Sequence, residues 1–242
     1  MVWLLGAFGA WAAQPIDASL PVGMTLHRLP FRDATTDHVN YLLYVPPAYA
    51  ARPDAAWPLI LFLHGSEQRG DNPVLLEDMD VLAFAQEVQD FPFIAVIPQC
   101  PANSIWSPAL VKSVLDAVED SLRVDTARVY LTGFSMGGYG TWQTAAALPG
   151  TFAAIAPVCG ISDIADVPRL SAIPTWAFHG ARDLNVSVNE SRRMVSALRA
   201  SGADVRLTVY PDLAHDCWTF TYRDSRLYLW FLDHSLSGPD EP

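Results

Sequence analysis

The chain has 242 residues with 15 basic and 26 acidic side chains, which gives a formal net charge of −11. Hydrophobic residues make up 51% of it and include 8 Trp, 11 Phe and 8 Tyr, a composition that excludes an intrinsically disordered chain. Lys112 is the only lysine and the arginines are scattered, so we expect no nucleic-acid partner and no stable insertion into a membrane.

Residues 1–13 form an apolar stretch without a charged side chain. The stretch is shorter than the roughly 20 residues that cross a bilayer. Small residues at Ala10 and Ala12 favour a secretory signal peptide, although the basic residues that usually precede the apolar part are missing. We expect a secreted or periplasmic protein. The alternative is a cytoplasmic protein whose apolar leader packs on the domain.

Short apolar runs alternate with amphipathic stretches along the rest of the chain. Strands are predicted at 38–45, 58–64, 93–97, 128–132, 152–158, 174–179 and 205–210, and helices at 76–88, 108–123, 138–148, 186–200 and 221–232. The alternation is typical of an α/β protein with a mostly parallel sheet. We expect residues 14–242 to form a single domain.

A G-x-S-x-G motif occupies residues 133–137. It follows a predicted strand and precedes a predicted helix, which is the context of a nucleophile elbow. The tight turn leaves no room for side chains at Gly133 and Gly137, and it lifts the Ser135 hydroxyl above the sheet edge. The positive end of the helix favours negative charge there. Ser135 is therefore the predicted nucleophile.

A serine hydroxyl needs a general base, and in this motif's setting the base comes last in the chain, after an acid. His215 lies in the loop after the last predicted strand and is the predicted base. His179 ends a strand, where it suits a structural turn. His234 ends the last helix, where we expect it to be exposed.

Asp183 is the predicted acid because it lies in the loop after strand 174–179. There it would accept a hydrogen bond from His215 and fix the tautomer of the imidazole. The alternative role for Asp183 is to cap the following helix. Competing acids are Asp163 and Asp166, one strand earlier, and Asp212, which is very close to His215 in sequence.

Two backbone amides are needed to stabilise the oxyanion. One is predicted to be that of Met136, directly after the nucleophile, and the other that of Ser66 in the loop after strand 58–64. His64, in the same loop, is expected to be structural. Trp106 and Trp218 lie on loops at the same sheet edge, where they would wall an acyl or aryl pocket or else pack under the loops.

The chain resembles compact α/β-hydrolase esterases described as predicted peptidases or as prolyl oligopeptidase-like. These are related to feruloyl esterases and polyhydroxybutyrate depolymerase-type enzymes. The matching stretches are 58–72, 96–101, 128–142, 152–160, 174–211 and 214–218. The resemblance implies an α/β-hydrolase fold with helices on both faces of the sheet, and a triad of Ser135, Asp183 and His215. It also implies that the Ser66 and Met136 amides form the oxyanion hole.

One departure from the resembling sequences lies in the oxyanion loop. Similar sequences read H-G-S-G-E-R-G, whereas Glu67 and Gln68 stand here in place of Gly and Glu. A charged side chain at this position could narrow the pocket or hydrogen-bond the substrate. Glu67 is therefore a candidate substrate contact.

Three cysteines, Cys100, Cys159 and Cys217, match neither a dense disulfide framework nor the spacing of a metal site. An odd number leaves at least one free thiol. If the protein is exported, one disulfide can form, and the sequence does not choose the pair.

We predict a serine carboxylic-ester hydrolase that forms an acyl-enzyme on Ser135 and needs no metal or organic cofactor. Its substrates would be small-molecule or polymer-linked esters with short-to-medium acyl or aryl groups, and acetyl, feruloyl and polyester units all remain open. No long insertion between strands suggests a large lid. The alternatives are a short-peptide serine peptidase and a non-catalytic binding protein of the same fold.

Overall fold

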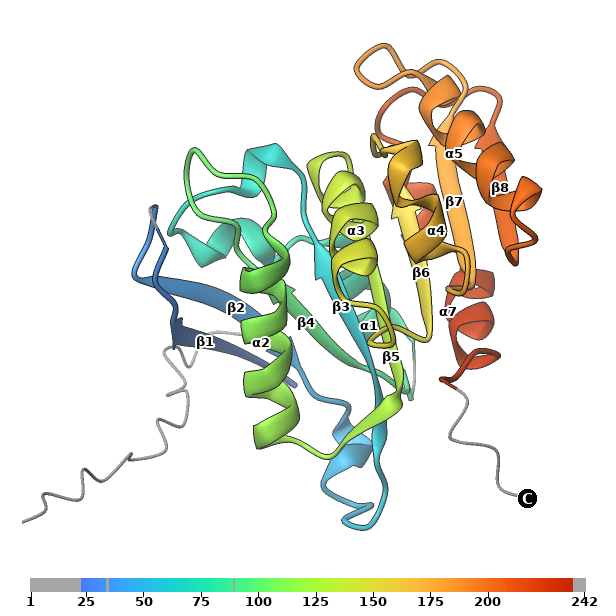
Figure 1. The fold of residues 1–242 in the computed structure, drawn as a ribbon. Helices are drawn as coiled ribbons and strands as arrows, with labels where there is room; N and C mark the ends of the chain where they lie inside the picture. The colour runs from blue at the N-terminus through green and yellow to red at the C-terminus, as the bar shows by residue number, and fades with distance from the viewer. Residues whose placement is uncertain (1–22, 34, 89, 237–242) are drawn as a thin grey trace, which may run out of the picture.

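The computed structural model describes residues 23–33, 35–88 and 90–236 (Figure 1). The leader predicted at residues 1–13 lies outside these ranges. The strands described are β1 Met24–Pro30, β2 His38–Tyr44, β3 Trp57–Leu63, β4 Ile94–Pro98, β5 Val124–Phe134, β6 Ala154–Val158, β7 Thr175–Gly180 and β8 Val205–Tyr210. They form one sheet in the order β1-β2-β4-β3-β5-β6-β7-β8.

The sheet is mostly parallel, as expected. The strands β3 to β8 pair in parallel, whereas β2 is antiparallel to both β1 and β4. The central strand β3 has the burial typical of a parallel sheet. Its residues from Leu59 to Leu63 have no exposed surface, so both faces of the strand are covered.

Helices cover both faces of the sheet (Figure 1). One face packs against α2 Pro108–Ser121, α3 Met136–Ala147, α4 Val167–Leu170 and α5 Val188–Ala200. The other packs against α1 Asp80–Glu87, α6 Trp218–Tyr222 and α7 Ser225–Leu232. None of the described helices has the length and apolar character needed to cross a membrane.

Two predicted helices differ from the observed ones, β5 is longer at both ends than the strand predicted at 128–132, and one strand was not predicted. The helix expected at 221–232 is two helices, because Asp224 leaves the helical path and caps α7 by accepting from the Arg226 amide. Residues 76–79 are not part of α1, since a 3₁₀ turn, Pro73–Leu76, precedes it. The strand β1 pairs along its full length with β2.

Parallel strands bring their carboxyl ends to the same edge of a sheet. The loops that follow β5, β7 and β8 therefore open at one edge. These loops carry Ser135, Asp183 and His215, three residues that are far apart in the sequence.

Candidate active site

Ser135 lies at the sharp turn between β5 and α3. Its backbone has φ 55° and ψ −115°, a conformation that residues with a Cβ atom rarely adopt. The turn is held on both sides, because the Ser135 amide donates to the Val158 carbonyl at 2.9 Å and the Tyr139 amide donates to the Ser135 carbonyl at 3.0 Å. The hydroxyl is thus presented at the start of α3.

The two glycines of the motif make this turn possible. A Cβ atom on either Gly133 or Gly137 would overlap the carbonyl oxygen of Leu63 in the neighbouring strand. Only glycine allows the backbone to pass this close. The same steric limit therefore explains both why the motif has glycine at 133 and 137 and why the turn at Ser135 is so tight.

Ser135, His215 and Asp183 form a chain of hydrogen bonds. The Nε2 atom of His215 lies 2.8 Å from Ser135 Oγ, and its Nδ1 atom lies 2.7 Å from Asp183 Oδ2. A carboxylate can only accept, so Nδ1 of His215 donates to it. The Nε2 atom is then free to accept the serine proton.

Asp183 is held as a charged carboxylate although its side chain is fully buried. Burial by itself raises the pKa of a carboxyl group. Hydrogen bonds from His215 and from the amides of Val186 and Asn185, which donate to Oδ1 at 2.9 Å each, outweigh burial and lower the pKa of Asp183 below 3.8. The alternative role as a helix cap is wrong, because Ser187 caps α5.

The loops that carry the acid and the base are joined by direct backbone contact. The Arg182 amide donates to the Leu213 carbonyl at 2.9 Å, one residue before Asp183 and two residues before His215. A Cβ atom on Gly180 would overlap the Ala214 carbonyl. This close approach fixes the distance between the two side chains.

A second histidine, His179, contacts the same oxygen of Asp183 that accepts from His215. Its ring is fully buried, and its Nε2 atom lies 3.2 Å from Asp183 Oδ2. The same Nε2 atom donates to the Val186 carbonyl at 2.9 Å, so Nδ1 accepts from Ser191 Oγ at 2.8 Å. Burial lowers the pKa of His179 and keeps the ring neutral. The contact with Asp183 was not predicted from the sequence.

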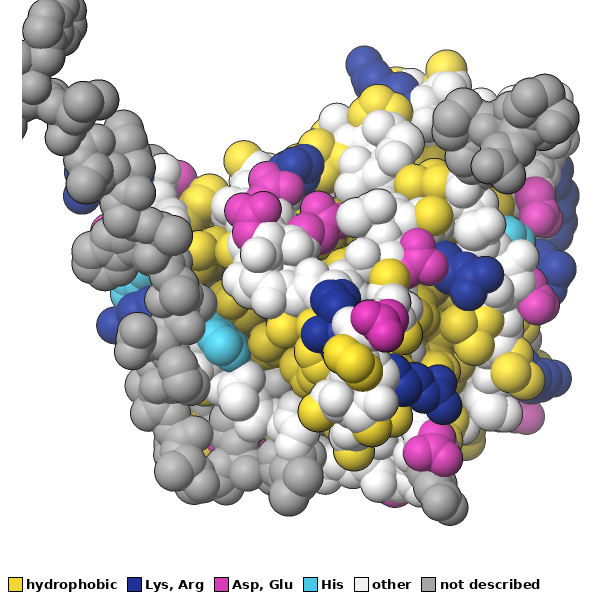
Figure 2. Space-filling view, turned by 90° about the horizontal axis from the view of Figure 1, so that it is seen from below, with side chains coloured by type: hydrophobic (Ala, Val, Ile, Leu, Met, Phe, Trp, Pro, Cys, Tyr) yellow, Lys and Arg dark blue, Asp and Glu magenta, His cyan; other side chains and the backbone are white. Residues whose placement is uncertain are grey.

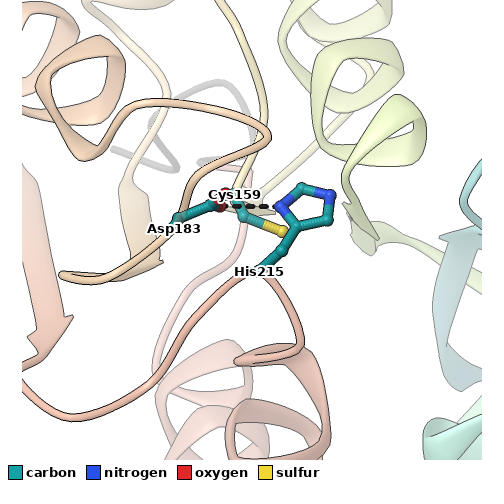
Figure 3. Close-up of side chains that lie close together, drawn as sticks. All are labelled: Cys159, Asp183 and His215. Atoms are coloured by element: carbon teal, nitrogen blue, oxygen red, sulfur yellow. Dashed lines mark hydrogen bonds and ion pairs between the residues drawn. The ribbon is translucent and has the colours of Figure 1, made fainter.

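Cys159 lies beside Asp183 and His215 (Figure 3). One ligand-type atom from each residue falls within 4.8 Å of the others, a grouping that can hold a metal ion. Here Asp183 and His215 bond directly to each other, which leaves no space between them for an ion. Burial also raises the pKa of the Cys159 thiol well above 9, so it lacks the thiolate that binds metals. The grouping does not fit a metal site.

All three cysteines are free and buried in this structure. A pairing among them stays a prediction that depends on export.

A cavity of about 710 Å³ opens in front of Ser135 and His215. Ser66, Glu67 and Trp218 line it, as predicted from their loops. The Trp218 indole stacks on Phe134, with ring centroids 4.4 Å apart, and meets the His215 ring edge to face. Trp218 therefore forms an aromatic wall next to the base.

The prediction that Trp106 lines the pocket is wrong. Its side chain is 1% exposed, and its indole nitrogen donates to the His64 carbonyl at 3.0 Å. The ring packs so closely on Gly140 of α3 that a Cβ atom there would overlap it. Trp106 supports the loop after β3 from below.

His64 is a buried structural residue. Its Nε2 atom accepts from the Cys100 amide at 3.0 Å, so Nδ1 donates to the Gly65 carbonyl at 2.6 Å. Burial lowers the pKa of His64 to about 4. The neutral ring fixes the start of the loop that carries Ser66.

The amides of Ser66 and Met136 are available to donate hydrogen bonds to a ligand oxygen. Ser66 begins the 3₁₀ helix Ser66–Gln68 and Met136 begins α3, so neither amide has an acceptor within its own helix. Gly65 brings this loop close to Phe134, because a Cβ atom at Gly65 would overlap the Phe134 ring.

The other residues considered as acid or base have different partners. Asp163 caps the 3₁₀ helix Ile164–Asp166, Asp166 pairs with an arginine, Asp212 pairs with Arg182, and His234 bonds to the Trp230 carbonyl. His234 is partly buried rather than exposed. Residues that the sequence did not single out also line the pocket, among them Asp78, Asp80 and Asp216.

The model of the dienelactone hydrolase family matches residues 104–228 of the chain. A thermostable esterase of known structure is 33% identical, with a TM-score of 0.76 over 87% of this chain and 63% of that one. A bifunctional acetylxylan esterase/xylanase from Neocallimastix patriciarum is 29% identical over 133 residues, 52% of this chain and 19% of its own. A putative carboxymethylenebutenolidase from Yersinia pestis is 29% identical over 134 residues, 47% of this chain. The matched segments cover 19% and 50% of the lengths of these two curated relatives, so the chain spans half of each or less.

Proposed function

The chain belongs to the dienelactone hydrolase family and has the α/β-hydrolase fold, and we propose that it is a hydrolase, specifically a serine carboxylesterase. The observation that carries the proposal is the unbroken series of hydrogen bonds from Ser135 through His215 to Asp183 at the floor of a pocket. This is the arrangement that turns a weakly nucleophilic hydroxyl into an attacking group.

In the proposed reaction, Ser135 Oγ attacks the ester carbonyl while His215 Nε2 takes its proton. The Ser66 and Met136 amides donate to the oxygen that becomes negative, and Asp183 stabilises the imidazolium. His215 then protonates the leaving alcohol, and an acyl group remains on Ser135. Water, activated by His215, releases the acid in the second half of the reaction.

The proposed substrates are esters with a short-to-medium acyl or aryl group. Support comes from the similarity to a thermostable esterase and to an acetylxylan esterase, and from a pocket that has Trp218 and Phe134 as aromatic surfaces. The pocket volume of about 710 Å³ suits a drug-sized ligand rather than a long lipid chain.

Lactones are a second candidate class. Several similar proteins have the name putative carboxymethylenebutenolidase, and a butenolide is an internal ester. The same nucleophile, base and oxyanion amides would open such a ring. The chemistry of Ser135 is identical for both classes, so only turnover of the two substrates separates them.

The test compares the wild-type chain with Ser135→Ala on p-nitrophenyl acetate and butyrate. We expect Ser135→Ala to stay folded by circular dichroism and to lose measurable turnover. Ser121→Ala, at the exposed end of α2, is the matched control and should keep full activity. Labelling with a fluorophosphonate should modify Ser135 alone. Turnover that survives in Ser135→Ala, or a label on another residue, contradicts the proposal.

A further inference from the structure

The charged residues that line the pocket are all acidic apart from His215. Glu67, Asp78, Asp80 and Asp216 contribute carboxylates, and no Lys or Arg side chain is among the described lining residues. They come from separate segments: the oxyanion loop, the turn before α1 and its first residue, and the position after the base. The fold therefore gathers negative charge around one opening.

Only one of these carboxylates has a cationic partner. Asp80 is half-buried, accepts from Thr219 Oγ1 at 3.1 Å and lies 3.7 Å from Arg223 Nε. Glu67, Asp78 and Asp216 are exposed and form no ion pair with any residue that the structure describes. Their charges are uncompensated at the mouth of the pocket.

Charges are arranged differently elsewhere on the surface. On the face seen from below in Figure 2, basic and acidic side chains lie beside one another. Neighbouring charges of opposite sign cancel at a distance, whereas three carboxylates around a concave opening add up.

We propose that Glu67, Asp78 and Asp216 select substrates by charge, so that the site prefers esters with a cationic acyl group over neutral ones and rejects anionic ones. The inference rests on the proposed esterase function and names its substrate class. An ester or lactone that carries a carboxylate would have to approach three like charges with no arginine or lysine to receive it.

The size of the effect follows from Coulomb's law. At a separation of roughly 8 Å in a water-like dielectric, one charge changes binding by about twofold, so three change it by roughly tenfold. Salt should reduce the preference, because the Debye length falls from about 10 Å at 0.1 M to about 3 Å at 1 M. Repulsion also helps to expel the carboxylate product.

The test uses three 4-nitrophenyl esters of nearly equal shape: 4-(trimethylammonio)butanoate, 5,5-dimethylhexanoate and 4-sulfobutanoate. Their kcat/KM values are measured with the wild-type chain, with Ser135→Ala as the blank. We expect the cationic ester to exceed the neutral one by roughly tenfold at low salt, and the sulfonate to fall below it by a similar factor. Both ratios should approach one in 1 M NaCl.

The double variant Asp78→Asn/Asp216→Asn should lower the cationic-to-neutral ratio about fourfold and raise the sulfonate-to-neutral ratio about fourfold. Ratios cancel any effect that the change next to His215 has on all three esters. Asp54→Asn/Asp120→Asn, at two exposed positions outside the pocket lining, is the matched control for removal of two negative charges and should leave the ratios unchanged. If the double variant fails to fold, the salt dependence of the wild-type ratios still tests the inference, because ratios that do not approach one in 1 M NaCl contradict it.

Equal turnover of the three esters, or ratios that ignore both salt and the double variant, overturns the inference but leaves the esterase intact. If the wild-type chain hydrolyses none of the three esters, or hydrolyses them no faster than Ser135→Ala does, the proposed function is overturned and the inference with it.

Discussion

The imidazole of His179 packs against Asp183, with its Nε2 atom 3.2 Å from the carboxylate oxygen that accepts from His215. One oxygen of Asp183 thus faces two histidines, while the other accepts two backbone amides. The Nε2 hydrogen of His179 is donated to the Val186 carbonyl, and the amide of the same residue donates to Asp183, so His179 also fixes the segment that holds the carboxylate. His179 therefore acts as a positioning residue for Asp183.

Replacing His179 with leucine removes the Nε2 hydrogen with only a small change in side-chain volume. We expect kcat to fall by about tenfold with little change in KM, because the orientation of Asp183 matters when His215 becomes charged. The unmatched Val186 carbonyl should also lower stability by about 1–3 kcal/mol. Steady-state kinetics well below the unfolding temperature measure the first effect.

Ser191→Ala is the control for that variant. It removes the partner of His179 Nδ1 and leaves the contact between Nε2 and Asp183 in place. We expect a stability loss of about 1 kcal/mol with normal kcat. Equal kinetic losses in the two variants would show that His179 acts only through packing.

Asp183→Asn tests the acid directly. The amide of asparagine can donate to His215 Nδ1, which favours the tautomer that has its hydrogen on Nε2 and cannot accept the Ser135 proton. We expect kcat to fall by about 10³- to 10⁴-fold with the fold intact. Asp212→Asn, which removes the same charge from the exposed pair with Arg182, should stay active. A loss below tenfold in Asp183→Asn would assign the acid elsewhere.

Gly137→Ala tests the steric requirement of the nucleophile turn. Its Cβ atom would overlap the Leu63 carbonyl, so β5 or α3 must move, at a cost of about 3 kcal/mol or more. Gly150→Ala is matched to it, because Gly150 has φ 74° but no atoms near the added Cβ. It should cost only about 1–2 kcal/mol. Urea unfolding curves compare the two variants, and equal losses would refute the steric explanation.

His64 should make stability depend on pH. Its pKa is about 4 in the folded chain, below the 6.5 of an unfolded histidine, so the unfolded state binds more protons between these values. The contribution is fully present above pH 6.5 and is lost as the pH falls toward 4, by about 3 kcal/mol in total. Unfolding free energies at pH 7, 5.5 and 4.5 measure it.

His64→Gln is the comparison for this pH effect. The variant starts from a lower stability at pH 7 because the contacts with the Cys100 amide and the Gly65 carbonyl are altered. Its stability should then fall less steeply than that of the wild type as the pH decreases. Parallel curves for the two chains would show that His64 does not carry the effect.

Much of the site could be named from the sequence because its rules are local. The motif around Ser135 follows from backbone sterics at two glycines, and the order of nucleophile, acid and base follows the order of the strands. Asp183 and His215 each come directly after a strand that could be recognised from its apolar run. The structure brings these three residues together at the predicted sheet edge.

Other features depend on neighbours that are distant in the chain. The strand β1 has weak apolar patterning, and its place is decided by pairing with β2. Whether the Trp106 indole faces the pocket or the core depends on the space above Gly140, which no local pattern reports. The break at Asp224 replaces a continuous helix by two, although the apolar spacing continues across it.

The sequence by itself determined the alternation of strands and helices, the nucleophile turn and the residue types available as base and acid, because these depend on backbone geometry and near neighbours. Only the tertiary structure decided that His179 supports Asp183, that Trp106 is buried, and that the pocket has unpaired carboxylates at its mouth. Those properties arise where loops from separate strands converge, and the distances between such loops are set by the packing of the whole sheet.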